Sequence, residues 1–209
     1  MIVAHPDDET LWAGGTLLSQ PEWQCFVACL CRGGDTDRAP RFHRALAALG
    51  AKGAMADLDD GPDQHPLPDE EVANAVLDLL PDGPFDLILT HGVRGEYTRH
   101  RRHEEVSRAV SKLWRTGQIG ADELWLFAYE DGGGRYLPRP IDGAPRRRLL
   151  PREVWQEKRR IVTDIYGFST DSFEARSAGE VEAFWGFRTP DEFDVLLDKG
   201  AKYEGPGPI

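Results

Sequence analysis

Short apolar runs alternate with helix-periodic segments through the first 130 residues, and this alternation limits the possible folds more than any other feature. Apolar runs suited to buried strands occur at 2–5, 24–31, 53–58, 85–90 and 124–129, and amphipathic helices are expected at 9–19, 40–49, 68–80 and 100–116. Strands that alternate with helices form parallel βαβ units, and near-continuous apolar strands are typical of sheets covered on both faces. The sequence therefore predicts a three-layer α/β domain with a mostly parallel sheet.

The alternation weakens after about residue 130, and we expect an irregular C-terminal extension of the same single domain. The stretch 131–152 is rich in Gly, Pro and Arg, which predicts a long loop that could act as a lid. A helix is expected over 155–166, within a helical extension that covers 153–209. The last ten residues are expected to be loosely held. With 209 residues, the chain is long enough to bury a sizeable core without disulfides.

Composition argues against several classes of partner. The formal net charge of −11 disfavours nucleic acid, whose phosphates require a basic surface. No run approaches the roughly 18 apolar residues of a membrane span, and the acids at 7–9 interrupt what would be the apolar part of a signal peptide. Cys25, Cys29 and Cys31 share one strand-like run, which favours buried, reduced thiols in a cytoplasmic protein over a cysteine metal site.

The sharpest motif, AHPDDE, lies between the first expected strand and the first expected helix. His5 and Asp8 offer a nitrogen and an oxygen ligand three residues apart across a tight turn, which suits a divalent transition metal such as Zn²⁺. Asp7 stands beside Asp8, so one carboxylate can bind the ion while the other faces a reacting water. Ligands of parallel sheets bind beyond the carboxyl ends of the strands, where this motif lies.

A second polar group follows the strand expected at 85–90. His91 ends that strand, and His100 and His103 lie three residues apart, so on a helix they share one face. One of these two histidines would complete a set of two His and one Asp with an open position, which is the catalytic type of metal site. The other could then donate a hydrogen bond to an oxyanion.

Each group also has a simpler interpretation. Asp7, Asp8 and Glu9 could merely stabilise the start of a helix, and His100 and His103 could be solvated residues of an Arg-rich segment. The joint occurrence of both groups at neighbouring strand ends favours the metal site. A non-catalytic sugar-binding module stays open as an alternative, although a binder needs no extra carboxylate beside the ligands. The chain has no G-x-G-x-x-G or Walker A pattern after its first strand.

With AHPDDE and a GEY segment followed by two histidines, the sequence resembles the PIG-L/LmbE-like metal-dependent de-N-acetylases over roughly residues 1–130. The resemblance implies a Rossmann-like hydrolase that removes acetyl groups from N-acetylglucosamine-type sugars or cleaves other amides. Matched motif to motif, it places His5, Asp8 and His103 on the family's zinc ligands. It likewise places Asp7 on the general base and His100 on the oxyanion-stabilising histidine.

The sequence departs from the family pattern at three positions. Members usually have His-Pro-Asp-His where this chain has His-Arg-Arg-His, so Arg102 replaces the acidic residue that tunes the first histidine. Tyr97 lies three residues before His100, where many members have a spacing of two. Arg41 stands where the resemblance leads us to expect glutamate.

Together these features predict a zinc-dependent hydrolase that cleaves an N-acyl amide, with Fe²⁺ as an alternative ion. An N-acetylglucosamine-type sugar is the expected substrate, and the nearest rival is an amidase that acts on a thiol conjugate or another non-sugar amide. A basic rim would favour an anionic substrate such as a phosphorylated amino sugar, whereas a solvated face that balances nearby acids is the simpler alternative. Similar proteins often form homo-oligomers. The candidate substrate-binding residues are Arg38, Arg41, Arg94, Tyr97 and Arg99.

Overall fold

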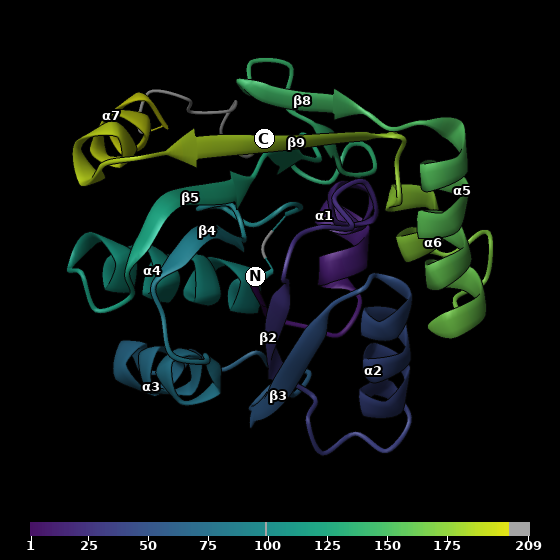
Figure 1. The fold of residues 1–209 in the computed structure, drawn as a ribbon, viewed down its shortest axis with the longest axis horizontal. Helices are drawn as coiled ribbons and strands as arrows, with labels where there is room; N and C mark the ends of the chain where they lie inside the picture. Colours follow the sequence, from purple (N-terminus) through teal and green to yellow (C-terminus); the bar gives the residue numbers. More distant parts are fainter. Residues whose placement is uncertain (99, 201–209) are drawn as a thin grey trace.

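The computed structural model describes residues 1–98 and 100–200, with the backbone alone for 196–200. Figure 1 shows a central series of strands with helices on both sides. The strands are β1 (Ile2–Val3), β2 (Phe26–Cys31), β3 (Lys52–Leu58), β4 (Phe85–Thr90), β5 (Ala121–Phe127), β6 (Tyr129–Glu130), β7 (Arg139–Pro140), β8 (Arg146–Leu149) and β9 (Val181–Phe187). The helices are α1 (Asp8–Leu18), α2 (Arg38–Ala48), α3 (Asp69–Leu79), α4 (Arg101–Arg115), α5 (Arg152–Arg160), α6 (Phe173–Ser177) and α7 (Pro190–Gly200), and the π-helical turn η1 (Ile161–Ile165) continues α5.

The strands form two larger sheets that lie side by side. β1, β2 and β3 are parallel, and β4 pairs with β5 in parallel, as the alternation predicted. β5 then pairs antiparallel with β9, and β9 with β8. β4 contacts β1, and the Thr90 hydroxyl donates to the Ile2 carbonyl oxygen at 2.9 Å. The spatial order is therefore β3-β2-β1-β4-β5-β9-β8, which confirms the predicted Rossmann-like α/β fold.

Helices cover both faces of this sheet, which explains why β2 is apolar along its whole length and β4 almost so. On one face α1, α2 and η1 bury Trp12, Phe42 and Ile161. On the other face α3 and α4 bury Val76 and Val110. In Figure 1 the first group lies to the right of β2 and the second to its left, so the three predicted layers are present.

The C-terminal third contains strands that the sequence analysis overlooked. Residues 131–152, expected to form a loop or lid, include β7 and β8, and the expected helical extension 153–209 includes β9. β8 has the sequence RRRL and alternates between half-buried and exposed residues, so its charges resemble those of a loop. The helix expected at 155–166 is observed as α5 with η1. The expectation for the chain end concerns 201–209, which lie outside the described residues.

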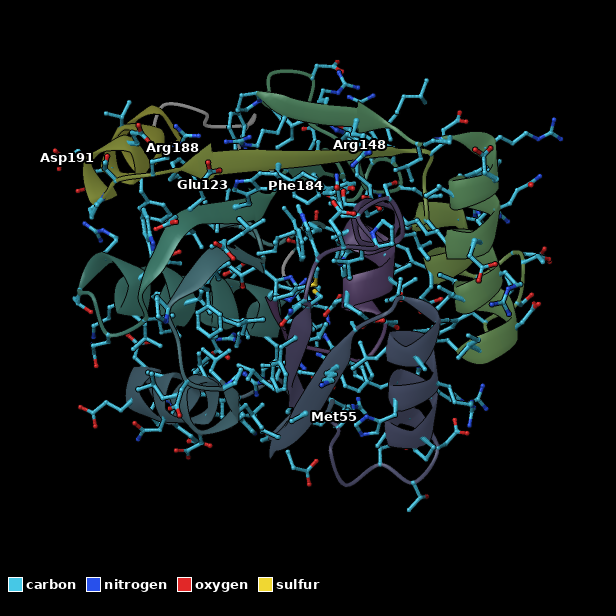
Figure 2. All side chains as sticks on the ribbon, in the orientation of Figure 1. Met55, Glu123, Arg148, Phe184, Arg188 and Asp191 are labelled. Carbon is cyan, nitrogen blue, oxygen red and sulfur yellow. The ribbon has the colours of Figure 1, made fainter. Side chains whose placement is uncertain are left out.

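One carboxylate ties the added antiparallel strands to the parallel ones. Glu123 on β5 forms ion pairs with Arg146 of β8 at 2.9 Å and with Arg188, just after β9, at 2.8 Å. Glu123 and Arg188 lie close together at the end of β9 in Figure 2. Because β9 is held between β5 and β8 in this way, the C-terminal segment is an integral part of the sheet.

A buried ion pair fixes α1, the helix that begins with the acidic motif. Lys158 of α5 and Glu182 of β9 are both fully buried, with 2.8 Å between Nζ and Oε1. Glu182 also accepts hydrogen bonds from the backbone N–H groups of Gly15 and Thr16, at 2.8 and 2.7 Å. A Cβ at Gly15 would lie 2.2 Å from the side chain of Leu150, so this close approach requires glycine. The pair therefore joins α1, α5 and β9 at one point.

Two further observations concern the cysteines and the helices. Cys25, Cys29 and Cys31 are free, and the last two are fully buried on β2. Within residues 1–98 and 100–200, no helix is long and apolar enough to cross a membrane.

Candidate active site

The two sequence motifs meet because β1 and β4 are neighbours in the sheet. His5 follows β1 in a tight turn, and Asp8 opens α1. His100 precedes α4, and His103 lies in its first turn. Parallel strands bring their carboxyl ends to one edge, so residues almost a hundred positions apart come into contact there.

The three predicted metal ligands present their atoms to one another in a small triangle. His5 Nδ1 lies 3.1 Å from His103 Nε2 and 3.3 Å from Asp8 Oδ2. His103 Nε2 lies 3.3 Å from Asp8 Oδ2. Tetrahedral ligands about 2.0–2.1 Å from a zinc ion are separated by roughly 3.3 Å. The spacing of this donor triangle therefore fits a divalent transition metal without rearrangement.

Electrostatics also favour a cation inside this triangle. Asp8 is buried, which opposes its charge, yet His103 and His91 hold the pKa of this carboxyl well below its ordinary value. Burial opposes the charge of His103 as well, but Asp8 and Glu96 raise the pKa of this imidazole to about 10. The side chain of Trp12 donates to the other oxygen of Asp8 at 2.9 Å and so fixes its orientation.

Glu96, which the sequence analysis did not single out, contacts the nitrogen of His103 that does not belong to the triangle. Its Oε2 lies 2.6 Å from His103 Nδ1 and 2.9 Å from His91 Nδ1, and its Oε1 accepts the backbone N–H of Gly92. Despite its burial, the two imidazoles and their hydrogen bonds lower the pKa of Glu96 to about 2. His91 Nε2 accepts the backbone N–H of Ala4 at 2.9 Å, so this nitrogen is already occupied. His91 therefore supports the site from β4, and Nε2 of His103 is left to face the triangle.

Asp7 is held in a strained turn beside the ligands. Its φ of 132° lies in a region that costs a non-glycine residue about 1–3 kcal/mol. Glu9 stabilises the turn, because its Oε2 accepts the Asp7 N–H while its Oε1 accepts the Tyr166 hydroxyl at 2.7 Å. Burial, together with the charges of Asp8 and Glu9, raises the pKa of Asp7 well above its ordinary value. Arg38 Nη1 lies 3.6 Å from Asp7 Oδ2 and opposes this shift.

His100 lies on the open side of the site. Its ring stacks on His103 with 4.2 Å between centroids and meets His5 edge-on at 4.6 Å. Its Nδ1 is buried and has no hydrogen-bond partner. Burial and the neighbouring histidines lower the pKa of His100 to about 3, so the ring is neutral.

Arg102 points away from His100. Its guanidinium donates to the backbone oxygens of Asp59 and His65 and pairs with Glu105. The arginine that replaces the usual acid therefore holds the 59–65 loop against α4, and the His100 Nδ1 has no acidic neighbour there.

That loop supplies Asp60, a second residue that the sequence analysis missed. Asp60 Oδ1 lies 3.1 Å from His5 Nε2, the nitrogen opposite the triangle, and Asp60 Oδ2 lies 2.6 Å from Arg32 Nη2. Although burial opposes it, the contact with His5 lowers the pKa of Asp60. A pair of acids before glycine, directly after the third expected strand, was the available signal.

These side chains line a cavity of about 220 Å³ that opens to solvent. Two of the predicted substrate-binding residues, Arg38 and Tyr97, line it, whereas Arg41 and Arg94 do not. Arg41 is instead bonded to Asp37 and to the Tyr166 carbonyl oxygen, and Arg99 lies outside the described residues. The lining residues are His5, Pro6, Asp7, Asp8, Leu11, Arg32, Arg38, Asp60, Tyr97, His100, Phe173 and Glu174.

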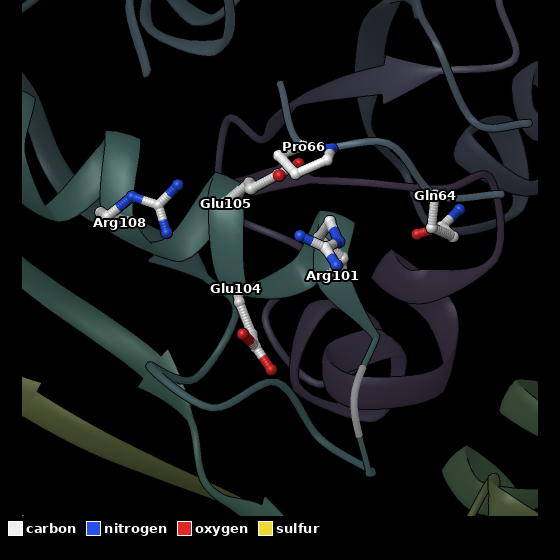
Figure 3. A pocket seen from close by; sticks show the side chains of 6 residues that line it. All are labelled: Gln64, Pro66, Arg101, Glu104, Glu105 and Arg108. Carbon is white, nitrogen blue, oxygen red and sulfur yellow. The ribbon is translucent and has the colours of Figure 1, made fainter. Parts of the chain in front are cut away.

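A second cavity, of about 230 Å³, lies at the start of α4 and contains none of the predicted ligands. Figure 3 shows the side chains that line it: Arg101, Glu104, Glu105 and Arg108 from this helix, and Gln64 and Pro66 from the loop before α3. The predicted site residues that line a cavity therefore line the first one, where His5, Asp7, Asp8 and His100 lie.

Comparison with solved structures finds this fold in several deacetylases and also in a hydratase. The deacetylase Dbv21, which acts on the pseudoaglycone of the antimicrobial A40926, superposes with a TM-score of 0.61 at 19% identity, over 90% of this chain and 96% of that one. N,N'-diacetylchitobiose deacetylase from Pyrococcus horikoshii gives 0.61 at 13% identity, over 90% and 82%. The 4-carboxy-2-hydroxymuconate hydratase GalB from Pseudomonas putida gives 0.54 at 16% identity, over 96% and 85%. The fold alone thus admits more than one reaction.

Sequence comparison identifies the family. An uncharacterized protein, L374, of Acanthamoeba polyphaga mimivirus is 25% identical in an alignment of 146 residues that covers 62% of this chain, and the chain spans 61% of that relative's length. The family model PIG-L, described as GlcNAc-PI de-N-acetylase, matches residues 1–114, more than half of the chain and all of the segment that carries the triangle, Asp7 and His100. The chain belongs to the PIG-L family.

Proposed function

We propose that this protein is a metal-dependent hydrolase that removes the acetyl group from an N-acetylglucosamine-type sugar or conjugate. The observation that carries the proposal is the donor triangle of His5, Asp8 and His103 with a second carboxylate, Asp7, beside it in an open cavity. Family membership and the deacetylases of the same fold support this reaction over other uses of the site.

The ligands are assigned by the atoms that face one another in the triangle. His5 Nδ1, Asp8 Oδ2 and His103 Nε2 would hold Zn²⁺, with Fe²⁺ as the alternative. The ion would polarise the amide carbonyl and lower the pKa of a water molecule. Asp60 and Glu96 contact the remaining nitrogens of the two imidazoles, and such partners orient the ligands of metal sites.

The chain's own residues account for the proton transfers. Asp7 would accept the proton from the attacking water as the C–O bond forms, and its raised pKa suits a base that works near neutral pH. Asp7 would then return this proton to the sugar nitrogen as the C–N bond breaks, which releases acetate and a free amine. His100 would donate a hydrogen bond to the oxyanion as a neutral imidazole, since its pKa is lowered.

The charges around the cavity favour an uncharged sugar. Four carboxylates line it (Asp7, Asp8, Asp60 and Glu174), and its two guanidiniums, Arg32 and Arg38, already face Asp60 and Asp7. A bound divalent ion would balance the remaining negative charge and leave no net positive charge for an anion. We therefore favour a neutral N-acetyl sugar over the anionic substrate that the basic segment suggested. A cytoplasmic location and assembly into a homo-oligomer stay predictions.

The decisive experiment is a release assay on protein of measured metal content. Acetate is measured from N-acetylated sugars, and primary amine from other amides, including thiol conjugates. Acetate release that Asp7→Asn abolishes at unchanged metal content would support the proposal. Amine release from non-sugar amides alone would favour the rival amidase, and no hydrolysis of either class by the metal-loaded protein would refute both.

A further inference from the structure

A second group of metal-binding side chains adjoins the donor triangle and shares one residue with it. Single ligand atoms of His5, Cys31 and Asp60 lie within 4.8 Å of one another. His5 contributes Nδ1 to the triangle, while its Nε2 lies 3.1 Å from Asp60 Oδ1 on the opposite side of the ring. The two nitrogens of one imidazole thus face two different sets of ligands.

Cys31 gives this second set a chemical character that the triangle lacks. It ends β2 and is fully buried and unoxidised. A thiolate selects soft ions such as Cd²⁺ and Zn²⁺, whereas the triangle offers only nitrogen and oxygen. Ligands of a tetrahedral zinc ion with one sulfur are separated by about 3.3–3.7 Å. Because the three atoms lie within 4.8 Å of one another, shifts of at most about 1.5 Å would bring them to the spacing of ligands of one ion.

The second set is open to the cavity on one side. The side chains of His5 and Asp60 are 14% and 8% exposed and both line the cavity, whereas Cys31 is fully buried and is not a lining residue. Arg32 pairs with Asp60 and places a positive charge nearby. That charge opposes a cation, so this set must bind more weakly than the triangle.

We propose that His5 Nε2, Asp60 and Cys31 form a second, inhibitory site for a soft divalent cation. On binding, the thiol proton of Cys31 and the Nε2 proton of His5 leave to the solvent, so that the imidazole bridges two ions. The hydrogen bond that orients His5 through Asp60 is then lost. Turnover therefore falls when the site fills. The inhibition rests on the proposed function, but the binding does not.

Thiolate-to-cadmium absorption in the ultraviolet tests the binding without any turnover. The parent protein is Cys25→Ser, because Cys25 is a half-buried thiol that could bind cadmium by itself. This parent is loaded with one equivalent of Zn²⁺ and titrated with Cd²⁺. The band requires a bond between cadmium and sulfur, and cadmium in the triangle would have no sulfur ligand. We therefore expect the band to saturate when one equivalent of Cd²⁺ has bound.

Variants of the parent decide which residues bind the ion. Cys31→Ser should lose the band, whereas Cys29→Ser, which removes the other buried thiol of the same strand, should keep it. Cys31→Ala provides a second test if the serine variant fails to fold, which circular dichroism would report. Asp60→Asn should lower the affinity of the second site for Cd²⁺ at least tenfold. A parent without the band, or Cys31 variants that retain it, would overturn the proposal.

Activity is a separate readout. In the parent, deacetylation should decline over the same range of Cd²⁺ concentration in which the band appears. A band without any loss of turnover would refute the inhibitory role and leave the site itself standing. Absence of deacetylation in the zinc-loaded parent would refute the proposed function, and the spectroscopic result would still decide the second site.

Discussion

Replacing Lys158 by methionine should destabilise the protein strongly, because it leaves a carboxylate buried without its cation. Lys158 and Glu182 are fully buried and lie 2.8 Å apart. Breaking a buried pair by removing one partner costs about 3–5 kcal/mol. For a protein of this size each kcal/mol lowers the Tm by about 2–4 °C, so we expect a decrease of roughly 6–20 °C.

The comparison that isolates burial is Arg160→Met on the same helix. Arg160 and Glu157 lie 2.6 Å apart but are 46% and 38% exposed, so this substitution should cost at most about 1 kcal/mol. The double variant Lys158→Met/Glu182→Gln should recover part of the loss. It leaves no buried charge, and the glutamine oxygen can still accept from one of the two α1 amides that Glu182 binds.

Urea unfolding of the four proteins, followed by circular dichroism, measures these differences. A Lys158→Met protein that loses less than about 1 kcal/mol, or no more than Arg160→Met, would refute the reasoning. It would mean that the carboxylate is satisfied by Gly15 and Thr16 alone or that water reaches it.

The remaining predictions concern the site and the helix that supports it. Asp7→Asn should keep the bound metal ion but lose at least about 100-fold in kcat, since general-base catalysis contributes about 10²–10⁴; unchanged turnover at full metal content would remove Asp7 from the mechanism. Glu96→Gln should weaken zinc affinity by about 10–100-fold through the orientation of His103, and competition with a chelating dye would reveal an unaltered affinity if this is wrong. Removal of the ion by a chelator should abolish activity and lower the Tm, because the ion binds only the folded chain; calorimetry with and without zinc checks this, and equal Tm values would contradict it. Gly15→Ala should cost about 1–3 kcal/mol through overlap with Leu150. The adjacent Gly14→Ala, whose nearest contact is 3.3 Å, should be nearly neutral in the same unfolding assay.

The parallel half of the fold could be read from the sequence because its strands are short, mostly apolar runs that alternate with helices. β4 is an example: FDLILT is predicted and observed with the same bounds. β8 could not be read in this way, because an edge strand with three arginines has the composition of a loop. Its partner β9 was missed with it, since β9 becomes a strand through its pairing with β5 and β8.

In the candidate site too, some residues could be found from the sequence and others could not. His5, Asp8 and His103 could be found because their chemistry is local in two short motifs. Asp60 was missed because its contact with His5 spans 55 residues and only the packed chain defines it. Glu96 is only seven residues from His103, but the sequence does not show that its carboxylate turns toward that imidazole. Arg41 illustrates the converse: its position after β2 suggested a substrate contact, but its guanidinium binds the end of η1.

The junction between β1 and β4 has a mechanical consequence. No backbone ladder joins these strands in the described part of the chain, and side-chain hydrogen bonds from Thr90 and to His91 connect them instead. His5 and Asp8 follow β1 of one sheet, and His103 follows β4 of the other. An ion held by all three would therefore link the two sheets at this junction. Loss of the ion should then increase the hydrogen-exchange rates of the amides of β1 and β4 before those of the other strands.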